Sequence, residues 1–226
     1  MSPDRSASNP TGERSWTITI PPFPLEGELI LPSGARSIVL FAHGSGSSRL
    51  SPRNRHVAAG LRRAGLGTLL FDLLTPDEGE DRRLVFDIEL LADRLLAATR
   101  WLRTQELTRD LAVGYFGAST GAAAALIAAA RSTESIGAVV SRGGRPDLAM
   151  PALDRVGAPT LLIVGALDHQ VLTLNRQALA ALRCEKKLAI VPGATHLFEE
   201  PGTLDQVIDL ASRWFATHLP GRAAEA

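Results

Sequence analysis

The sequence predicts a single-domain α/β protein with a mostly parallel sheet, helices on both faces of it and an antiparallel N-terminal edge. Six short runs are apolar throughout, which is typical of strands covered on both faces. They are residues 37–42, 68–71, 111–116, 136–140, 160–164 and 188–191. Helical patterns lie between most of these runs, and alternating strands and helices favour a parallel sheet.

The antiparallel edge comes from two earlier strands, at residues 16–20 and 25–31. In residues 25–29, leucine or glycine alternates with glutamate, a period of two that indicates a half-exposed strand. The intervening residues 21–24 read PPFP, which fits a turn.

Two later segments have apolar residues at helical spacing, and each predicts an amphipathic helix. The first face consists of Ile88, Leu91, Leu95, Ala98 and Leu102, and the second of Val207, Ala211, Trp214 and His218. The connection between residues 136–140 and 160–164 is too short for a large cap domain, so we expect none.

Length and composition suit one compact domain, because the chain has 226 residues of which 45% are hydrophobic. We expect a disordered segment at residues 1–14, one folded domain at 15–220 and a loose tail at 221–226. A formal net charge of zero argues against binding to nucleic acid or to anionic membranes.

Neither a secretory signal nor a membrane-spanning apolar run is visible, which favours a cytoplasmic protein. Acidic, histidine and cysteine residues show no metal-ligand spacing, and neither a G-x-G-x-x-G pattern nor a P-loop occurs. We therefore expect no metal and no cofactor.

Ser119 lies between two glycines, in Gly117-Ala-Ser-Thr-Gly121, where a predicted strand turns into a predicted helix. One interpretation is a helix N-cap, whose side-chain oxygen accepts a hydrogen bond from a free backbone N–H. The other is the nucleophile of a G-x-S-x-G elbow, exposed on a sharp strand-to-helix turn.

Two further strand ends carry the partners that a serine nucleophile requires. Asp168 follows the strand at 160–164, and His196 follows the strand at 188–191. In sheets of this kind, ligands bind beyond the carboxyl ends of the strands. His196 is expected to act as the base and Asp168 to orient it. Asp147 is an alternative acid, and His43 is an alternative base that better fits a structural hydrogen bond.

An oxyanion formed at Ser119 would need two backbone donors. We expect one to be the N–H of Thr120 and the other the N–H of Ser45, in the Gly- and Ser-rich loop after residues 37–42. Gly44 is a neighbour that could share the role of Ser45.

The segments HGSGSS, GYFGASTGAA, LLIVGALDHQV and VPGATHLFEEPGTL make the chain similar to the α/β-hydrolase superfamily, and within it to dienelactone hydrolase-like proteins. The resemblance covers roughly residues 16–219 and implies an α/β-hydrolase fold with serine-hydrolase chemistry. The family enzyme uses a cysteine nucleophile, where this chain has Ser119. That enzyme also holds its substrate carboxylate with arginines, one just beyond the catalytic histidine, where this chain has Glu199 and Glu200.

These departures favour a carboxylesterase acting on small or medium acyl esters, with a small-molecule ester or lactone as its ligand. Dienelactone-type lactone hydrolysis is an alternative, as is an acyltransferase or perhydrolase that uses the same residues. A non-catalytic binder of the same fold is the least favoured alternative. The oligomeric state is not indicated by the sequence.

Arg142 follows the strand at 136–140 and should border the same crevice as Ser119. One interpretation is that it binds a substrate carboxylate through charge-assisted hydrogen bonds. The other is that it braces loops by pairing with an acid of the protein, such as Asp72 or Glu78.

Overall fold

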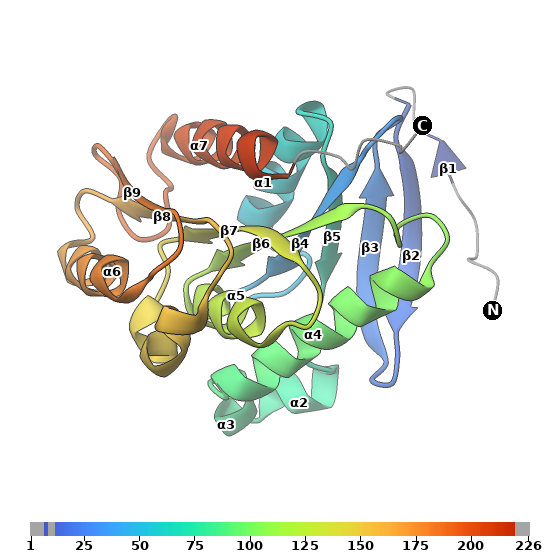
Figure 1. Cartoon of the computed structure of the whole chain (residues 1–226), viewed down its shortest axis with the longest axis horizontal. Coiled ribbons are helices and arrows are strands. Elements are labelled where there is room, and N and C mark those ends of the chain that lie inside the picture. Colours follow the sequence, from blue (N-terminus) through green and yellow to red (C-terminus); the bar gives the residue numbers. More distant parts are fainter. Residues whose placement is uncertain (1–6, 9–11, 220–226) are drawn as a thin grey trace.

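The computed structural model describes residues 7–8 and 12–219, and within them nine strands form one sheet (Figure 1). The strand order is β1-β2-β3-β5-β4-β6-β7-β8-β9. Strands β4 to β9 are mutually parallel, whereas β1, β2 and β3 form an antiparallel edge. The strands are β1 (Ala7–Ser8), β2 (Arg14–Ile20), β3 (Leu25–Leu31), β4 (Ser37–Ala42), β5 (Gly67–Phe71), β6 (Ala112–Ala118), β7 (Ile136–Arg142), β8 (Thr160–Gly165) and β9 (Lys186–Val191). The predicted mostly parallel sheet with its antiparallel edge is confirmed.

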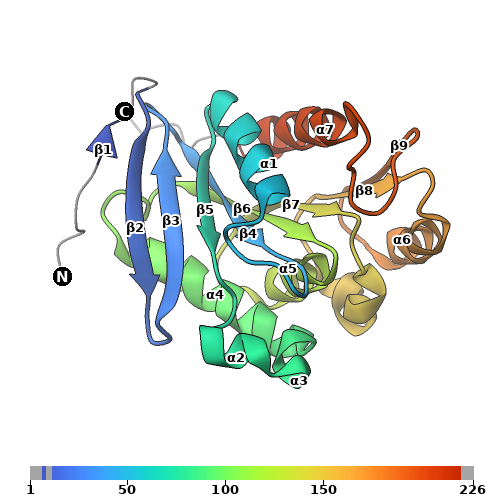
Figure 2. The same cartoon turned by 180° about the vertical axis from the view of Figure 1, so that it is seen from behind.

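Helices cover both faces of the sheet, as Figures 1 and 2 show from opposite sides. One core layer lies between the sheet and helices α4, α5, η1 and α6, and the other lies between the sheet and helices α1 and α7. Two short helices, α2 and α3, lie between β5 and α4. The helices are α1 (Pro52–Arg63), α2 (Pro76–Glu80), α3 (Arg82–Val85), α4 (Ile88–Thr104), α5 (Thr120–Arg131), the 3-10 helix η1 (Pro146–Arg155), α6 (His169–Ala181) and α7 (Thr203–His218).

Helix α4 shows how the sequence pattern becomes packing. Asp87 begins it as the N-cap, and its side chain accepts a hydrogen bond from the backbone N–H of Leu90. Leu91, Leu95 and Leu102 lie on the predicted face and are at most 3% exposed. Burial of each such side chain contributes roughly 1.5–3 kcal/mol to stability, so this face fixes the helix on the sheet.

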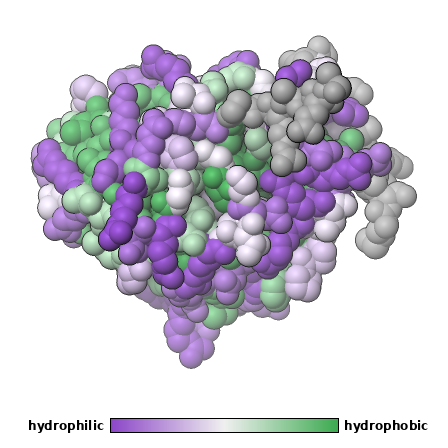
Figure 3. Space-filling model, in the orientation of Figure 1, coloured by the Kyte–Doolittle hydropathy of each residue, from purple (hydrophilic) through white to green (hydrophobic). Residues whose placement is uncertain are grey.

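Burial differs between the centre and the edge of the sheet. Every residue of β4, β5 and β8 is buried, as their apolar runs predict. Strand β9 is the last strand of the sheet, and Ile190 in it is 43% exposed. Hydrophobic residues gather on the left of the surface in Figure 3, over the region where β8 and β9 lie.

The disordered segment predicted at residues 1–14 lies mostly outside the described residues. Ala7–Ser8 pair with β2 as a short antiparallel strand, and β2 itself begins at Arg14. Residues 1–6 and 9–11 lie outside the described residues, as does the tail predicted at 221–226.

The connection from β7 to β8 holds only the helix η1, so the carboxyl edge of the described sheet carries no large cap domain. Strands β4, β6, β7, β8 and β9 all end at this edge, and their loops meet there. None of the helices within residues 12–219 is both long and apolar enough to cross a bilayer.

Candidate active site

Ser119 joins β6 to α5 in a backbone conformation that few serines adopt. Its φ of 51° and ψ of −122° store strain of about 1–3 kcal/mol, which the surrounding structure must hold. The backbone N–H of Ser119 donates to the carbonyl of Arg142, and its carbonyl accepts from the N–H groups of Ala122 and Arg145. Although Ser119 occupies the N-cap position of α5, its side chain makes no capping hydrogen bond. The N-cap interpretation is therefore wrong, and the hydroxyl is held without being used by the helix.

The two glycines of this turn are required by close contacts. A Cβ on Gly117 would lie 2.4 Å from the Cα of Ala122, and a Cβ on Gly121 would lie 2.2 Å from the carbonyl oxygen of Ala42. Both distances are far below van der Waals contact, and both clashes are with backbone. The glycines thus allow the turn to be tight and α5 to begin against the end of β4.

Asp168 and His196 come together at neighbouring strand ends. The Nδ1 of His196 lies 2.6 Å from the Oδ2 of Asp168, in a side-chain hydrogen bond between residues 28 positions apart. Asp168 stands at the N-cap of α6, but its carboxylate does not cap that helix. The carboxylate is 13% exposed and the imidazole 38% exposed, so the acid is sheltered while the ring reaches solvent. Because Nδ1 faces Asp168, the Nε2 of His196 is left for proton transfer.

The alternative acid and base have other partners. Asp147 accepts two hydrogen bonds, at 2.9 and 2.8 Å, from Arg145, two residues before it. The Nε2 of His43 accepts a hydrogen bond from the backbone N–H of Leu73, and Nδ1 donates to the carbonyl of Gly44. Burial lowers the pKa of His43, which keeps the ring neutral. His43 therefore ties the loop after β4 to the end of β5, as the structural interpretation of it predicts.

The loop that carries His196 is fixed from three sides. Phe198 is 2% exposed and has a φ of 56°, so this turn is anchored in the core. The carboxylate of Glu200 accepts hydrogen bonds from the backbone N–H and the hydroxyl of Thr195, and the hydroxyl lowers the pKa of Glu200. Gly143, with a φ of 51°, lies directly against this loop, because a Cβ there would be 3.1 Å from the carbonyl oxygen of His196. The ring is thereby held beside the end of β7, where the backbone of Ser119 bonds to Arg142.

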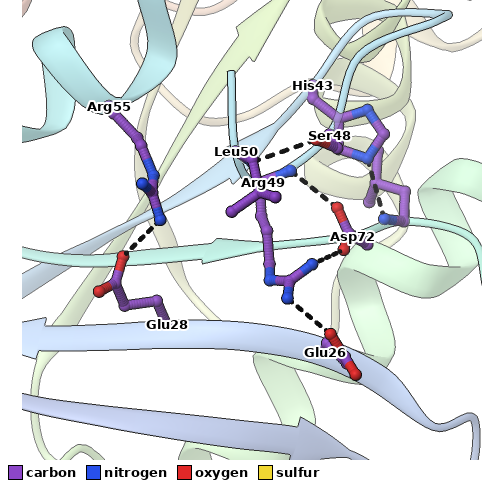
Figure 4. A network of polar contacts seen from close by, with 9 residues as sticks. Glu26, Glu28, His43, Ser48, Arg49, Leu50, Arg55 and Asp72 are labelled. Carbon is purple, nitrogen blue, oxygen red and sulfur yellow. Dashed lines mark hydrogen bonds and ion pairs between the residues drawn. The ribbon is translucent and has the colours of Figure 1, made fainter. Parts of the chain in front are cut away.

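The loop after β4 is also held in place, by the network in Figure 4. The backbone N–H and the guanidinium of Arg49 donate to the two carboxylate oxygens of Asp72, at 2.7 and 2.5 Å, and the same guanidinium reaches Glu26 on β3 at 2.5 Å. With His43 at one end of the loop and Arg49 at the other, residues 43–49 are fixed on the strands beneath them. Gly44 lies against Ser119, since a Cβ at this position would be 3.1 Å from the Cβ of Ser119.

Ser45 and Thr120, the residues expected to supply the oxyanion donors, are adjacent. The backbone N–H of Ser45 donates to the Oγ1 of Thr120 at 2.8 Å. Both amide groups therefore lie next to Ser119, but the one from Ser45 already has an acceptor. An oxyanion would have to replace or share that acceptor, a feature that sequence reasoning missed.

Arg142 is buried, with a relative exposure of 7%, at the end of β7. Its Nε and Nη1 have no hydrogen-bond partner among the described residues, and its Cζ lies 6.0 Å from the ring centroid of Phe198. Burial, with a smaller effect from the charge of Arg53, lowers its pKa to about 10. The guanidinium is therefore desolvated, and neither its Nε nor its Nη1 has a hydrogen-bond partner within the described part of the chain.

The loop brace considered for Arg142 is wrong for both acids named. Asp72 is bound to Arg49, and Glu78 lies 2.6 Å from Arg94. Each acid has an arginine nearer to it than Arg142.

No three histidine, cysteine, aspartate or glutamate side chains within the described ranges cluster as metal ligands do. The structure adds roles that the sequence did not indicate. Arg49 and Glu200 hold the loops of the site, and Leu74, Gly79 and Val85 line a cavity beside it. Of these contacts, only the one between Glu200 and Thr195, five residues apart, is local enough for the sequence to have suggested it.

Comparisons with known proteins identify relatives of this arrangement. A sequence model of the dienelactone hydrolase family matches residues 78–212. The crystal structure of a dienelactone hydrolase from Anabaena variabilis ATCC 29413 superposes with a TM-score of 0.90 at 55% identity, covering 92% of this chain and all of that one.

A further solved structure, XC6422 from Xanthomonas campestris, is described as an α/β serine hydrolase without a lid. It has a TM-score of 0.74 at 22% identity and covers 96% of this chain and all of its own, a likeness that shows the fold. Among curated relatives, "Putative phosphoribosyl transferase Rv0571c" of Mycobacterium tuberculosis (strain ATCC 25618 / H37Rv) is 58% identical over 218 residues, which are 96% of this chain and 49% of the relative. The chain thus spans about half the length of that curated relative.

The family model covers more than half of the chain, and the Anabaena protein matches along its whole length. By sequence and by fold, this chain belongs to the dienelactone hydrolase family and is an enzyme of the α/β-hydrolase type.

Proposed function

We propose that the protein is a serine hydrolase that cleaves small or medium carboxylic esters through an acyl-enzyme at Ser119. The observation that carries this proposal is the hydrogen bond of 2.6 Å between His196 Nδ1 and Asp168 Oδ2, at strand ends next to the uncapped, strained Ser119. A serine hydroxyl is a weak nucleophile at neutral pH, so a base and an orienting acid are the partners it needs.

The proposed reaction has two steps. The Oγ of Ser119 attacks the ester carbonyl carbon while the Nε2 of His196 takes the hydroxyl proton. The bond from that carbon to the alcohol oxygen then breaks, His196 returns the proton to this oxygen, and the alcohol leaves. Water repeats the sequence on the acyl-serine, giving the carboxylic acid and free Ser119. Asp168 keeps His196 in the required tautomer and stabilises the imidazolium.

We assign to the backbone N–H groups of Thr120 and Ser45 the stabilisation of the negative charge that develops on the carbonyl oxygen. Ser45 N–H would turn from the Oγ1 of Thr120 to the oxyanion, an acceptor that carries charge and so bonds more strongly. Such an exchange favours the transition state over the resting enzyme.

The test is covalent labelling with a fluorophosphonate probe, followed by hydrolysis of 4-nitrophenyl acetate. Wild-type protein should label once, and Ser119→Ala should neither label nor turn over, with a loss on the order of 10⁴-fold or more. Ser135→Ala is the matched control, since that serine is exposed and precedes β7 at the opposite end of the strand. Labelling of Ser119→Ala at the wild-type rate would refute the proposal.

Arg142 supports a narrower version, hydrolysis of esters or lactones that carry a free carboxylate. Its guanidinium is buried, has two nitrogens without a partner among the residues that the structure describes, and lies beneath the loop that holds His196. The leaving alcohol must approach His196, so the carboxylate belongs on the alcohol part of the substrate. Hydrolysis of 4-acetoxybenzoate should therefore exceed that of neutral 4-acetoxybenzamide, and equal kcat/KM values for the two would remove this version.

Acyl transfer or perhydrolysis would use the same acyl-enzyme with an alcohol or peroxide as acceptor, and added acceptors in the same assay distinguish them from hydrolysis. We do not propose for this chain the phosphoribosyl transfer in the name of the longer mycobacterial relative, because the chain spans about half of that protein.

A further inference from the structure

A cavity of about 370 Å³ is lined in part by Gly44, the residue at which a Cβ would lie 3.1 Å from the Cβ of Ser119. One wall is the loop of residues 43–48 after β4, and the opposite wall is formed by residues after β5 and in helices α2, α3 and α4. We call it the Gly79 pocket; it is lined by residues 43–48 and by Asp72, Leu74, Thr75, Pro76, Gly79, Val85 and Leu91. Its volume is at the small end of the range for small-molecule sites.

The order of strands places this pocket relative to the proposed chemistry. Ser119 follows β6, which lies between β4 and β7 in the sheet. The ring of His196 lies against Gly143, which follows β7. Gly44, which follows β4, contacts Ser119 on one side and lines the pocket on the other. His196 must protonate the leaving oxygen, so the alcohol part of an ester belongs on the β7 side. The acyl part is then directed to the β4 side, toward the pocket.

Polar groups in the lining are largely used by the protein itself. Both nitrogens of His43 are hydrogen-bonded, and both carboxylate oxygens of Asp72 accept from Arg49. The hydroxyl of Thr75 accepts the backbone N–H of Glu78, in the capping box that begins α2. What remains for a ligand is the apolar surface of Leu74, Val85 and their neighbours on one wall, with the hydroxyls of Ser45 and Ser47 on the other. Such a lining favours an apolar group over a charged or polar one.

Gly79 leaves space that its own backbone does not require. It lies within the short helix α2, its φ is outside the positive range, and a Cβ added there would meet no atom within 4 Å. A side chain at this position is therefore compatible with the fold and would occupy the rim of the pocket.

We propose that the Gly79 pocket holds the acyl chain of the substrate and that Gly79 sets the chain length accepted. This inference rests on the proposed esterase function and adds its specificity: an apolar acyl chain of medium length is preferred to acetyl. The interaction is hydrophobic, so each further methylene that enters the pocket should raise kcat/KM until the pocket is full.

The test is kcat/KM for the 4-nitrophenyl esters of acetate, butyrate, hexanoate and octanoate, measured on the wild type, Gly79→Leu and Val85→Phe. Both variants should lower the value for the longest well-accepted ester about tenfold and change that for acetate less than twofold. Gly157→Leu is the matched control: it also faces open space, with no positive φ, but precedes β8 at the opposite end of the sheet. It should leave the whole profile unchanged.

Several results would overturn the inference. An acyl-length profile identical in the wild type and both variants would show that the chain does not enter this pocket. A shift in preference for the alcohol part, measured with acetate esters of increasing alcohol length, would assign the pocket to the leaving group. An equal loss on all esters would mean that the variants disturb the nucleophile rather than the pocket. A wild type that hydrolyses none of the esters would refute the proposed function, and this inference with it, whereas an active enzyme with an unchanged profile refutes only the inference.

Discussion

Replacing Arg142 by methionine separates a ligand-binding arginine from a structural one, because the two roles predict opposite effects on stability. Methionine retains much of the buried alkyl stem but removes the charge and the two unpartnered nitrogens. An unsatisfied buried polar group costs about 1–3 kcal/mol, and the lowering of this pKa from 12.5 to about 10 corresponds to about 3 kcal/mol against the charged form. The lost interaction with the ring of Phe198, at 6.0 Å, offsets about 0.5–1 kcal/mol of this.

We therefore expect Arg142→Met to unfold with an unchanged or higher free energy, by up to about 2 kcal/mol. For a chain of this size that is a rise in Tm of up to about 4–8 °C. The activity should change in the opposite direction. A charge-assisted hydrogen bond to a carboxylate contributes about 1.5–3 kcal/mol, so KM for 4-acetoxybenzoate should rise at least tenfold while that for 4-acetoxybenzamide stays nearly constant.

The assays are thermal unfolding followed by circular dichroism and steady-state hydrolysis of the two esters. Arg94→Met is the control: Arg94 is similarly buried and its Nε and Nη1 also lack partners among the described residues, but its Nη2 is bound to Glu78 at 2.6 Å and it stacks on Phe23 at 3.3 Å. That variant should lose about 2 kcal/mol and melt about 4–8 °C lower. The reasoning is refuted if Arg142→Met also melts several degrees lower and loses activity on both esters equally.

Three further predictions concern the proposed catalytic residues and the turns that hold them. Asp168→Asn should lower kcat on the order of 10⁴-fold while Asp147→Asn costs little, and the reverse ranking in ester hydrolysis would reassign the acid. Gly121→Ala places a Cβ 2.2 Å from a backbone oxygen, so urea unfolding should show a loss of about 1–3 kcal/mol or more, and kcat should fall. A fully active, equally stable variant would contradict the tight turn at Ser119. Burial lowers the pKa of His43, so the unfolded state binds the proton more readily; stability present above pH about 6.5 should be lost as the pH falls toward the folded-state pKa, with a slope of up to about 1.4 kcal/mol per pH unit. His43→Gln should remove this part of the slope, and an unchanged pH dependence of unfolding would show that His43 is not its source.

The fold was accessible from sequence because its signals are local. Apolar runs of strand length marked β4 to β9, and the period-two pattern marked β3. The turn at Ser119 was recognisable for the same reason, since the glycines on either side of it are required by contacts within a few residues and with the neighbouring strand. The strand-end rule then named Asp168 and His196 as the residues to pair with it, and the catalytic roles of all three stay predictions.

The partners of charged and polar side chains were decided by the tertiary structure alone. Twenty or more residues separate Arg49 from Asp72 and Asp168 from His196, and 75 separate Ser45 from Thr120. Residue type and spacing do not say which arginine reaches which acid, because every candidate has the right charge and only the register of the sheet fixes the distances.

Arg142 shows the consequence most directly. From the sequence it was one arginine among many, with Asp72 and Glu78 available as partners. In the folded chain Arg49 and Arg94 lie nearer to those acids. Arg142 is left buried beside the proposed nucleophile, and two of its nitrogens have no partner within residues 7–8 and 12–219. The sequence by itself thus determined strands β2 to β9, helices α4 and α7 and the tight turn, which depend on neighbours along the chain. The open pocket and the unpaired charge exist only in three dimensions, because each is defined by what distant segments fail to fill.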